Sequence, residues 1–231
     1  MSKSPYGNSD TPGIFLMRRA GWFHRVMMVP EKPATGDRKP VMDALVDLID
    51  AGGGLEFSRG ELLRIIALAQ SEYDSLQPGL GKPSEFRSWG GATTPAVYFA
   101  FFEAATWTRT IKDRFEGPLK AAVQPQDSNL WNRLQRIRSQ SVGGVFEDAR
   151  GLASTNLHWY SPPYAGCGAK IVEGKLIYPI VDSGDDREDF RNNMKFDKGR
   201  HAEVVVEEYW NSTCHFIDGI LDEFYPKGLI T

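Results

Sequence analysis

The stretch FSRGELLRIIALAQSEYDSL, residues 57–76, decides the fold class of this chain. It opens as a capping box, in which the Ser58 hydroxyl accepts the amide of Glu61 and the Glu61 carboxylate reaches back to the start of the helix. Phe57 and Leu62 stand where a hydrophobic staple places its two residues. Apolar residues then recur at helical spacing: Leu62, Leu63, Ile65, Ile66, Ala69 and Tyr73. The pattern predicts an amphipathic helix that begins at Ser58.

The same periodicity recurs along the rest of the chain. It predicts further helices over 41–54, 94–115, 129–152 and about 200–224. The run AGGG at 51–54 is interpreted as the stop of the first of these, because glycine is common where helices end. Gly143-Gly144 interrupts the helix at 129–152, which indicates a kink or a close contact with a neighbouring backbone. Asp127 or Ser128 is expected to cap the start of that helix.

One short segment is predicted to be β structure. AKIVEGKLIYPIV, residues 169–181, has the pattern of a small hairpin that turns at Glu173-Gly174. The fold class that follows is mainly α: an antiparallel bundle of about four long helices with a small β-hairpin before the last helix.

The N-terminal part of the chain differs in charge from the remainder. Residues 1–40 carry seven basic and three acidic residues, a net charge of +4, so the rest of the chain carries −7. We predict a basic, Pro/Gly-rich arm over 1–40 and a helical bundle domain over 41–231, which should fold without residues 1–38. The segment IFLMRRAGWFHRVMMV at 14–29 suggests a hairpin or an extended arm. A basic arm on an acidic body either docks a partner or is a solvated tail.

Composition excludes several classes of protein. A hydrophobic content of 41% is enough for a globular core. The longest apolar run, at 96–102, is too short to span a bilayer, and no secretory signal is expected at the N-terminus. The two cysteines, Cys167 and Cys214, are too few for a disulfide framework, so a cytoplasmic location is predicted. The net charge of −3 argues against a general nucleic-acid coat protein.

The end of the helix at 129–152 carries the strongest candidate for catalysis. In ARGLASTNLHWYSPPYAG, residues 149–166, Arg150 lies in the expected last helical turn and His158 in the loop that follows. An Arg and a His together can cleave RNA without metal: the His transfers a proton and the Arg stabilises charge on the phosphate. Asn156 would orient the His. The structural alternative is that Arg150 complements the helix dipole and that His158 packs against aromatic neighbours.

Two other groups of side chains are candidates for binding RNA or a partner. Arg133 and Arg136 lie on the expected polar face of the helix at 129–152. Arg18, Arg19 and Arg25 belong to the basic arm. A protein partner or self-association is expected, and RNA is the second class of ligand.

No metal or cofactor is predicted. Cys167, Cys214, His201 and His215 lack the paired spacing of a zinc site, and Cys214-His215 is interpreted as structural. The acidic segment at 182–189 lacks the spacing of a calcium loop. The chain has no phosphate-binding glycine motif.

The layout of the chain over about residues 57–225 resembles the HEPN superfamily of prokaryotic helical domains. Four helices, an Arg/Asn/His corner after the third and a closing amphipathic helix carry the resemblance. It implies either a metal-independent ribonuclease, with two motifs meeting across a dimer, or a non-catalytic module that binds RNA or a partner. The chain departs from the catalytic motif, because Gly151 follows Arg150 and seven residues separate Arg150 from His158. The rival pair, Arg191-Asn192 with His201, has nine intervening residues.

These observations favour an interaction module over an enzyme. The prediction is a non-catalytic helical module that dimerises or docks a larger protein or RNA assembly, in a context of prokaryotic antiviral defence or toxin–antitoxin systems. The alternative is an endoribonuclease of HEPN type that uses Arg150 and His158.

Overall fold

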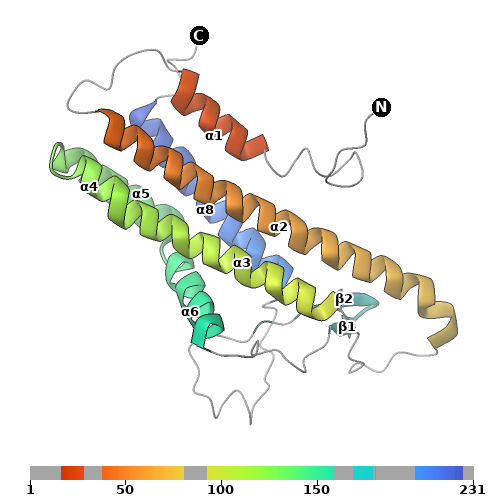
Figure 1. The fold of residues 1–231 in the computed structure, drawn as a ribbon. Helices are drawn as coiled ribbons and strands as arrows, with labels where there is room; N and C mark the ends of the chain where they lie inside the picture. Colours follow the sequence, from red (N-terminus) through yellow and green to blue (C-terminus); the bar gives the residue numbers. More distant parts are fainter. Residues whose placement is uncertain are drawn as a thin grey trace. The chain divides into compact units, whose positions relative to one another are not determined.

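The computed structural model describes residues 17–28, 38–80, 93–158, 169–178, 180 and 201–225. These residues are mainly helical, and an antiparallel two-stranded hairpin precedes the last helix (Figure 1). The elements in chain order are α1 (Met17–Met28), α2 (Arg38–Leu80), α3 (Thr93–Arg114), the π-helical turn η1 (Phe115–Leu119), α4 (Lys120–Val123), α5 (Ser128–Val142), α6 (Val145–His158), β1 (Lys170–Val172), β2 (Lys175–Ile177) and α8 (Ala202–Phe224). The predicted fold class is confirmed.

The chain divides into two compact units. Unit 1 comprises Met1–Phe57, Trp107–Glu147 and Tyr209–Thr231, and unit 2 comprises Ser58–Thr106 and Asp148–Glu208. Helices α2, α3 and α8 each contribute one part to each unit. The sequence predicted an arm over 1–40 and a bundle over 41–231; in the structure α1 belongs to unit 1 together with the first half of α2.

Helix α2 corrects two predictions. It runs without interruption for 43 residues, so the glycines at 52–54 do not stop a helix and Ser58 does not begin one. Ser58 is fully buried in the middle of α2. Glu61 does not reach back to cap a helix; its Oε2 accepts a hydrogen bond from Arg64 Nη2 at 2.7 Å. The expected capping box is therefore an ordinary helix interior in which the serine hydroxyl serves no cap.

This position leads to a first prediction. Ser58 Oγ is buried and has no hydrogen-bond partner in the described part of the chain, so Ser58→Ala removes an unsatisfied polar group and places alanine, the best helix former, in the middle of α2. We expect the free energy of unfolding to stay the same or to rise by about 0.5 kcal/mol. Urea unfolding of both proteins checks this, and a loss of about 1 kcal/mol would instead indicate the cap that the sequence suggested.

Helix α1 corrects the prediction of a hairpin or an extended arm at 14–29. Met17–Met28 forms a helix in which Trp22 and Val26, four residues apart, are only 2% and 5% exposed. Residues with this spacing share one face of a helix, and here that face is part of the core of unit 1.

The chain between α3 and α6 follows the local signals with one exception. The helix predicted over 94–115 is not followed by a loop, because the π-helical turn η1 continues from α3 and leads directly into α4. Asp127 caps α5 as predicted, since its Oδ1 accepts the amide of Leu130 at 2.8 Å. The break between α5 and α6 falls at Gly143, so the predicted kink is a complete interruption of the helix.

Aromatic side chains make the centre of unit 1. Phe115 stacks on Trp131 with ring centroids 4.9 Å apart and meets the edge of Phe216 at 5.1 Å. Phe146 also packs against Phe216 in an edge-to-face arrangement, with ring centroids 5.3 Å apart. All four rings are buried. They join η1, α5, α6 and α8, so the apolar positions of α8 at helical spacing form the core that their periodicity predicted.

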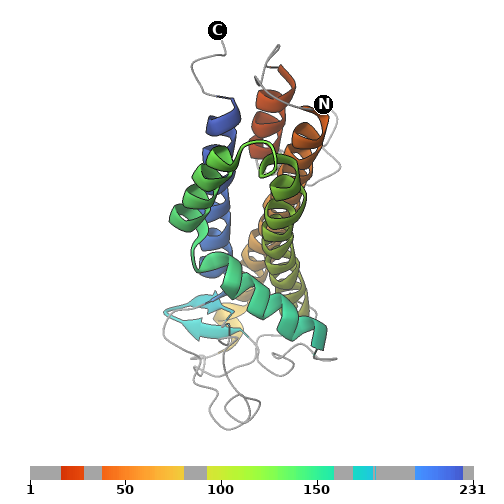
Figure 2. The same ribbon diagram turned by 90° about the vertical axis from the view of Figure 1, so that its left-hand side faces the viewer.

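The hairpin is anchored within unit 2. Strands β1 and β2 pair antiparallel, with Ile171 opposite Leu176, and they turn at Glu173 and Gly174 as predicted (Figure 2). Both turn residues have positive φ angles, 48° and 78°, as a two-residue hairpin of this kind requires. Gln70 of α2 fixes the hairpin: its Oε1 accepts the Leu176 amide at 2.8 Å, and its Nε2 donates to the Gly174 carbonyl at 3.0 Å.

Candidate functional site

The predicted catalytic corner lies on a helix. Helix α6 extends to His158, so Arg150 sits in its interior and not in its last turn, and His158 is not in a loop. Arg150 is exposed, as predicted. The side chains of residues 154–158 lie outside the described residues, so the structure does not place those of Asn156 and His158.

The helical backbone limits what this corner does. Arg150 and His158 are eight positions apart, a rise of about 12 Å along α6. The proposed role of Asn156 in orienting His158 stays a prediction.

The polar face predicted for 129–152 is divided by the break at Gly143. Arg133 and Arg136 belong to α5, and Arg150 belongs to α6. Arg133 Nε donates to Glu223 Oε2 of α8 at 2.8 Å, whereas Arg136 is exposed. The three arginines do not form one continuous surface along a single helix.

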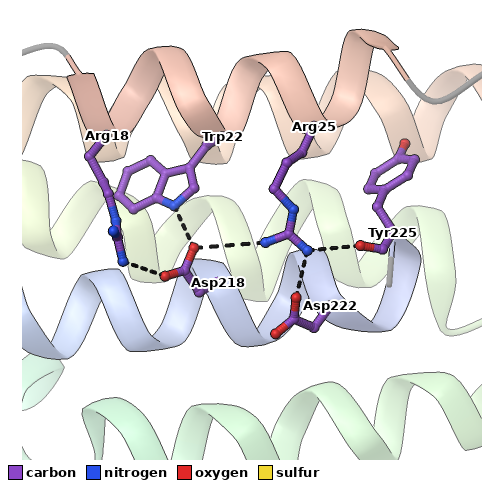
Figure 3. A network of polar contacts seen from close by, with 6 residues as sticks. All are labelled: Arg18, Trp22, Arg25, Asp218, Asp222 and Tyr225. Atoms are coloured by element: carbon purple, nitrogen blue, oxygen red, sulfur yellow. Dashed lines mark hydrogen bonds and ion pairs between the residues drawn. The ribbon is translucent and has the colours of Figure 1, made fainter. Parts of the chain in front are cut away.

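The arginines of the expected arm are bonded inside unit 1 (Figure 3). Arg18 Nη2 donates to Asp218 Oδ2 at 2.5 Å, and the indole N–H of Trp22 donates to Oδ1 of the same carboxylate at 2.9 Å. Arg25 Nη2 donates to Asp222 Oδ1 at 2.6 Å and to the carbonyl of Tyr225 at 2.8 Å. This network connects one face of α1 to the last two turns of α8.

A second set of contacts joins α1 to α2. The Glu56 carboxylate is 2% exposed and accepts the backbone amides of Arg18 and Arg19, each at 3.1 Å. These are the amides that a helix N-terminus leaves without an internal partner, so Glu56 caps α1 from another helix. The side chain of Arg19 donates to Asp50 Oδ1 through Nη2 at 2.5 Å and through Nε at 3.1 Å.

The glycines of α2 explain how α1 comes so close. A Cβ at Gly52 would lie 2.7 Å from Ile217 Cδ1 and 2.8 Å from Trp22 Cζ3, distances that real Cβ atoms do not show. The indole of Trp22 therefore occupies the space that a side chain on α2 would fill. It also contacts the ring of Trp210 at 5.9 Å between centroids. The AGGG run positions α1 instead of ending a helix.

A cluster of titratable side chains in unit 2 was not predicted from the sequence. Tyr178 is fully buried, and its hydroxyl has no hydrogen-bond partner among the described residues; burial raises its pKa to about 12. Glu203, in the first turn of α8, has a buried Oε2 that no described residue hydrogen-bonds, and burial raises the pKa of its carboxyl. His201 Nε2 lies 3.8 Å from Glu203 Oε1. The Ala202 amide donates to the Tyr178 carbonyl at 2.9 Å, which ties the start of α8 to the segment after β2.

The raised pKa of Glu203 gives a prediction for stability against pH. Because the folded pKa lies above the unfolded one, the neutral form stabilises the fold below the unfolded pKa, and this contribution is lost as pH rises through the folded pKa. Glu203→Gln keeps the neutral form at every pH. At pH 7.5 we expect Glu203→Gln to raise the free energy of unfolding by roughly 1 kcal/mol, because it replaces a buried, ionised carboxylate by a neutral amide. At pH 4 we expect little effect, because the carboxyl is then already neutral.

Urea unfolding at the two pH values measures this difference. Glu208→Gln is the matched control, because Glu208 is exposed on the same helix and the substitution changes the same charge. Equal effects of Glu203→Gln at pH 4 and pH 7.5 would contradict the assignment of the stability change to the Glu203 carboxyl.

Neither a metal site nor a membrane span is found in the described ranges. No three His, Cys, Asp or Glu side chains among those residues are grouped so that they could hold a metal ion. None of the helices in the same part of the chain combines the length and the apolarity needed to cross a bilayer. The chain matches no protein-family model, no curated protein and no solved structure. The resemblance to the HEPN superfamily remains a prediction from the layout of the sequence.

Proposed function

We propose that this protein is a non-catalytic helical interaction module that self-associates or docks onto a larger protein assembly. The observation that carries the proposal is Phe99 of α3, which is 64% exposed although its neighbours Tyr98 and Phe101 are buried. Burying such a side chain at an interface contributes about 1.5–3 kcal/mol, which is a large share of the affinity of a transient complex.

Other elements of unit 2 also carry exposed apolar side chains. These are Leu68 of α2, Val172 of β1 and Val204 of α8, with exposed fractions of 57%, 36% and 48%. Scattered apolar residues are normal on a protein surface. An exposed phenylalanine is a stronger indication, because aromatic residues are enriched in the centres of interfaces.

The charges of the described residues favour a protein over RNA as the partner. Arg18, Arg19, Arg25 and Arg133, four of the five arginines proposed for binding, are each bonded to a carboxylate within unit 1. A phosphate backbone would have to displace these carboxylates before it gained the same contacts.

Light scattering and sedimentation equilibrium of the purified chain test the proposal. We expect reversible self-association that Phe99→Ala weakens by about tenfold or more, while the free energy of unfolding changes by less than about 0.5 kcal/mol. Glu103→Ala is the control, since Glu103 is exposed one turn further along α3. If Phe99→Ala and Glu103→Ala associate like the unchanged protein, Phe99 is not the docking residue.

The second candidate function is a metal-independent ribonuclease of HEPN type, as found in defence or toxin systems. The observation that favours it is the exposed Arg150 on the helix that also contains His158. Incubation with single-stranded RNA in EDTA separates the two functions, and we expect no cleavage. Cleavage that His158→Ala lowers by on the order of a hundredfold, without loss of stability, would overturn the non-catalytic proposal.

A further inference from the structure

Helix α1 is held in unit 1 in the manner of a bound peptide. It has 12 residues, a length at which an isolated helix is marginal in water. It has no acidic residue in its first turn, and Glu56 of α2 supplies the cap for the amides of Arg18 and Arg19. The helical form of α1 therefore depends on the surface that receives it.

That surface lies on α2 and α8, and we call it the α1 groove. It consists of Asp50, Gly52 and Glu56 on α2 together with Asp218 and Asp222 on α8. Gly52 makes room for an indole ring, and Asp218 receives both the indole N–H and an arginine (Figure 3). The groove thus recognises side chains at three positions of a helix: an arginine, a tryptophan four residues after it, and a second arginine seven residues after the first.

The charges of the groove and of its occupant are complementary. Three carboxylates of the groove, Asp218, Asp50 and Asp222, bind the side chains of Arg18, Arg19 and Arg25, and the fourth, Glu56, accepts two backbone amides of α1. The chain beyond residue 40 has a net charge of −7, so its field attracts a basic segment and raises the rate of encounter. A neutral or acidic helix could still donate its first amides to Glu56, but it would leave the three aspartates without a cationic partner.

We propose that the α1 groove is a docking site for a basic amphipathic helix of a partner protein, and that α1 occupies it in the resting chain. The partner helix carries arginine, tryptophan and arginine at the spacing of Arg18, Trp22 and Arg25. It replaces α1 by making the same contacts. The groove is a different surface from the one around Phe99, so this inference and the proposed function can fail independently.

The covalent link gives α1 an advantage over any partner. Nine residues, 29–37, join α1 to α2, and a connection of this length holds a tethered segment at an effective concentration of the order of millimolar. A partner helix must therefore bind more tightly than α1 or meet a chain whose α1 is already weakened. The free energy with which α1 binds its own groove therefore sets the affinity that a partner helix must exceed to replace it.

A peptide of residues 17–28 is the probe, and the full chain with Trp22→Ala is the receptor, since its own α1 has lost the indole. We expect the labelled peptide to bind this receptor, by fluorescence anisotropy, at least tenfold more tightly than it binds the unchanged chain. Asp218→Asn in the receptor should weaken binding at least tenfold. Asp113→Asn should leave it unchanged, because Asp113 is exposed on α3 and lies outside the groove.

A second receptor and a second measurement complete the test. If Trp22→Ala fails to fold, the receptor is the full chain with Arg25→Ala. In the unchanged chain, excess peptide should accelerate hydrogen exchange of the α1 amides. Absence of binding by both receptors, or binding that Asp218→Asn does not weaken, overturns the proposal. A dimer of the unchanged chain that excess peptide dissociates to monomers would assign the groove to a second copy and would also overturn it.

Discussion

Replacing Trp22 by Ala is expected to cost about 3–5 kcal/mol of the free energy that holds α1 in unit 1, the usual range for truncating a buried aromatic side chain. Trp22 is 2% exposed, its ring fills the space above Gly52, and its indole N–H donates to Asp218 at 2.9 Å. Removing it opens a cavity between α1 and α2 and takes a donor from the carboxylate that also receives Arg18.

Hydrogen exchange and urea unfolding together measure this effect. We expect the amides of α1 to lose protection, and the global free energy of unfolding to fall by no more than the free energy of α1 docking. His24→Ala is the control, because His24 is exposed two positions away on the same helix. Unchanged protection of α1 in Trp22→Ala would mean that the ion pairs alone hold the helix, and the network in Figure 3 would then be its main attachment.

Local signals predicted the elements that depend on local structure. The turn at Glu173-Gly174 has two residues with positive φ angles, and it lies between two short apolar runs of the sequence. Asp127 caps α5 because an N-cap requires only a short polar side chain three residues before the amide it accepts. Both features follow from neighbouring residues, so the sequence pattern was sufficient for them.

The errors occurred where a distant helix decides the structure. Glycine at 52–54 is a common helix stop, and Ser58 with Glu61 has the form of a capping box. In the structure these glycines are required by α1 and α3, whose tryptophans contact the backbone of α2. The sequence shows that glycine is present but does not show which side chain approaches it.

The candidate sites show the same contrast. The spacing of Arg18, Trp22 and Arg25 is helical and could have identified α1, as could the matching spacing of Asp218 and Asp222 on α8. The cluster at Tyr178 and Glu203 has no such signal. Its character comes from burial, which depends on how the hairpin and α8 pack and not on the residues beside them in the chain.

The second large effect is expected from replacing a glycine by alanine. The expected change in the free energy of unfolding has the opposite sign to the change that helix propensity alone predicts. In an exposed helix, Gly→Ala stabilises by about 1 kcal/mol. At Gly54 of α2 we expect Gly54→Ala to destabilise unit 1 by about 1–3 kcal/mol, the usual cost of overpacking a core. The added Cβ would lie 2.7 Å from Cε3 of Trp107 and nearer still to Cδ2 and Cε2. A fused ring cannot yield as the end of a flexible side chain does.

The same substitution at Gly21 is the matched control. Gly21 is exposed in the interior of α1, and a Cβ there would meet nothing within 4 Å, so Gly21→Ala should show the ordinary gain of up to about 1 kcal/mol. Urea unfolding should therefore show a lower free energy of unfolding for Gly54→Ala and a higher one for Gly21→Ala, although both variants add the same methyl group. Destabilisation by Gly54→Ala would show that the ring of Trp107 packs directly on the backbone of α2. A gain at both positions would mean that α3 stands further from α2 and that the glycine run at 52–54 has no packing role.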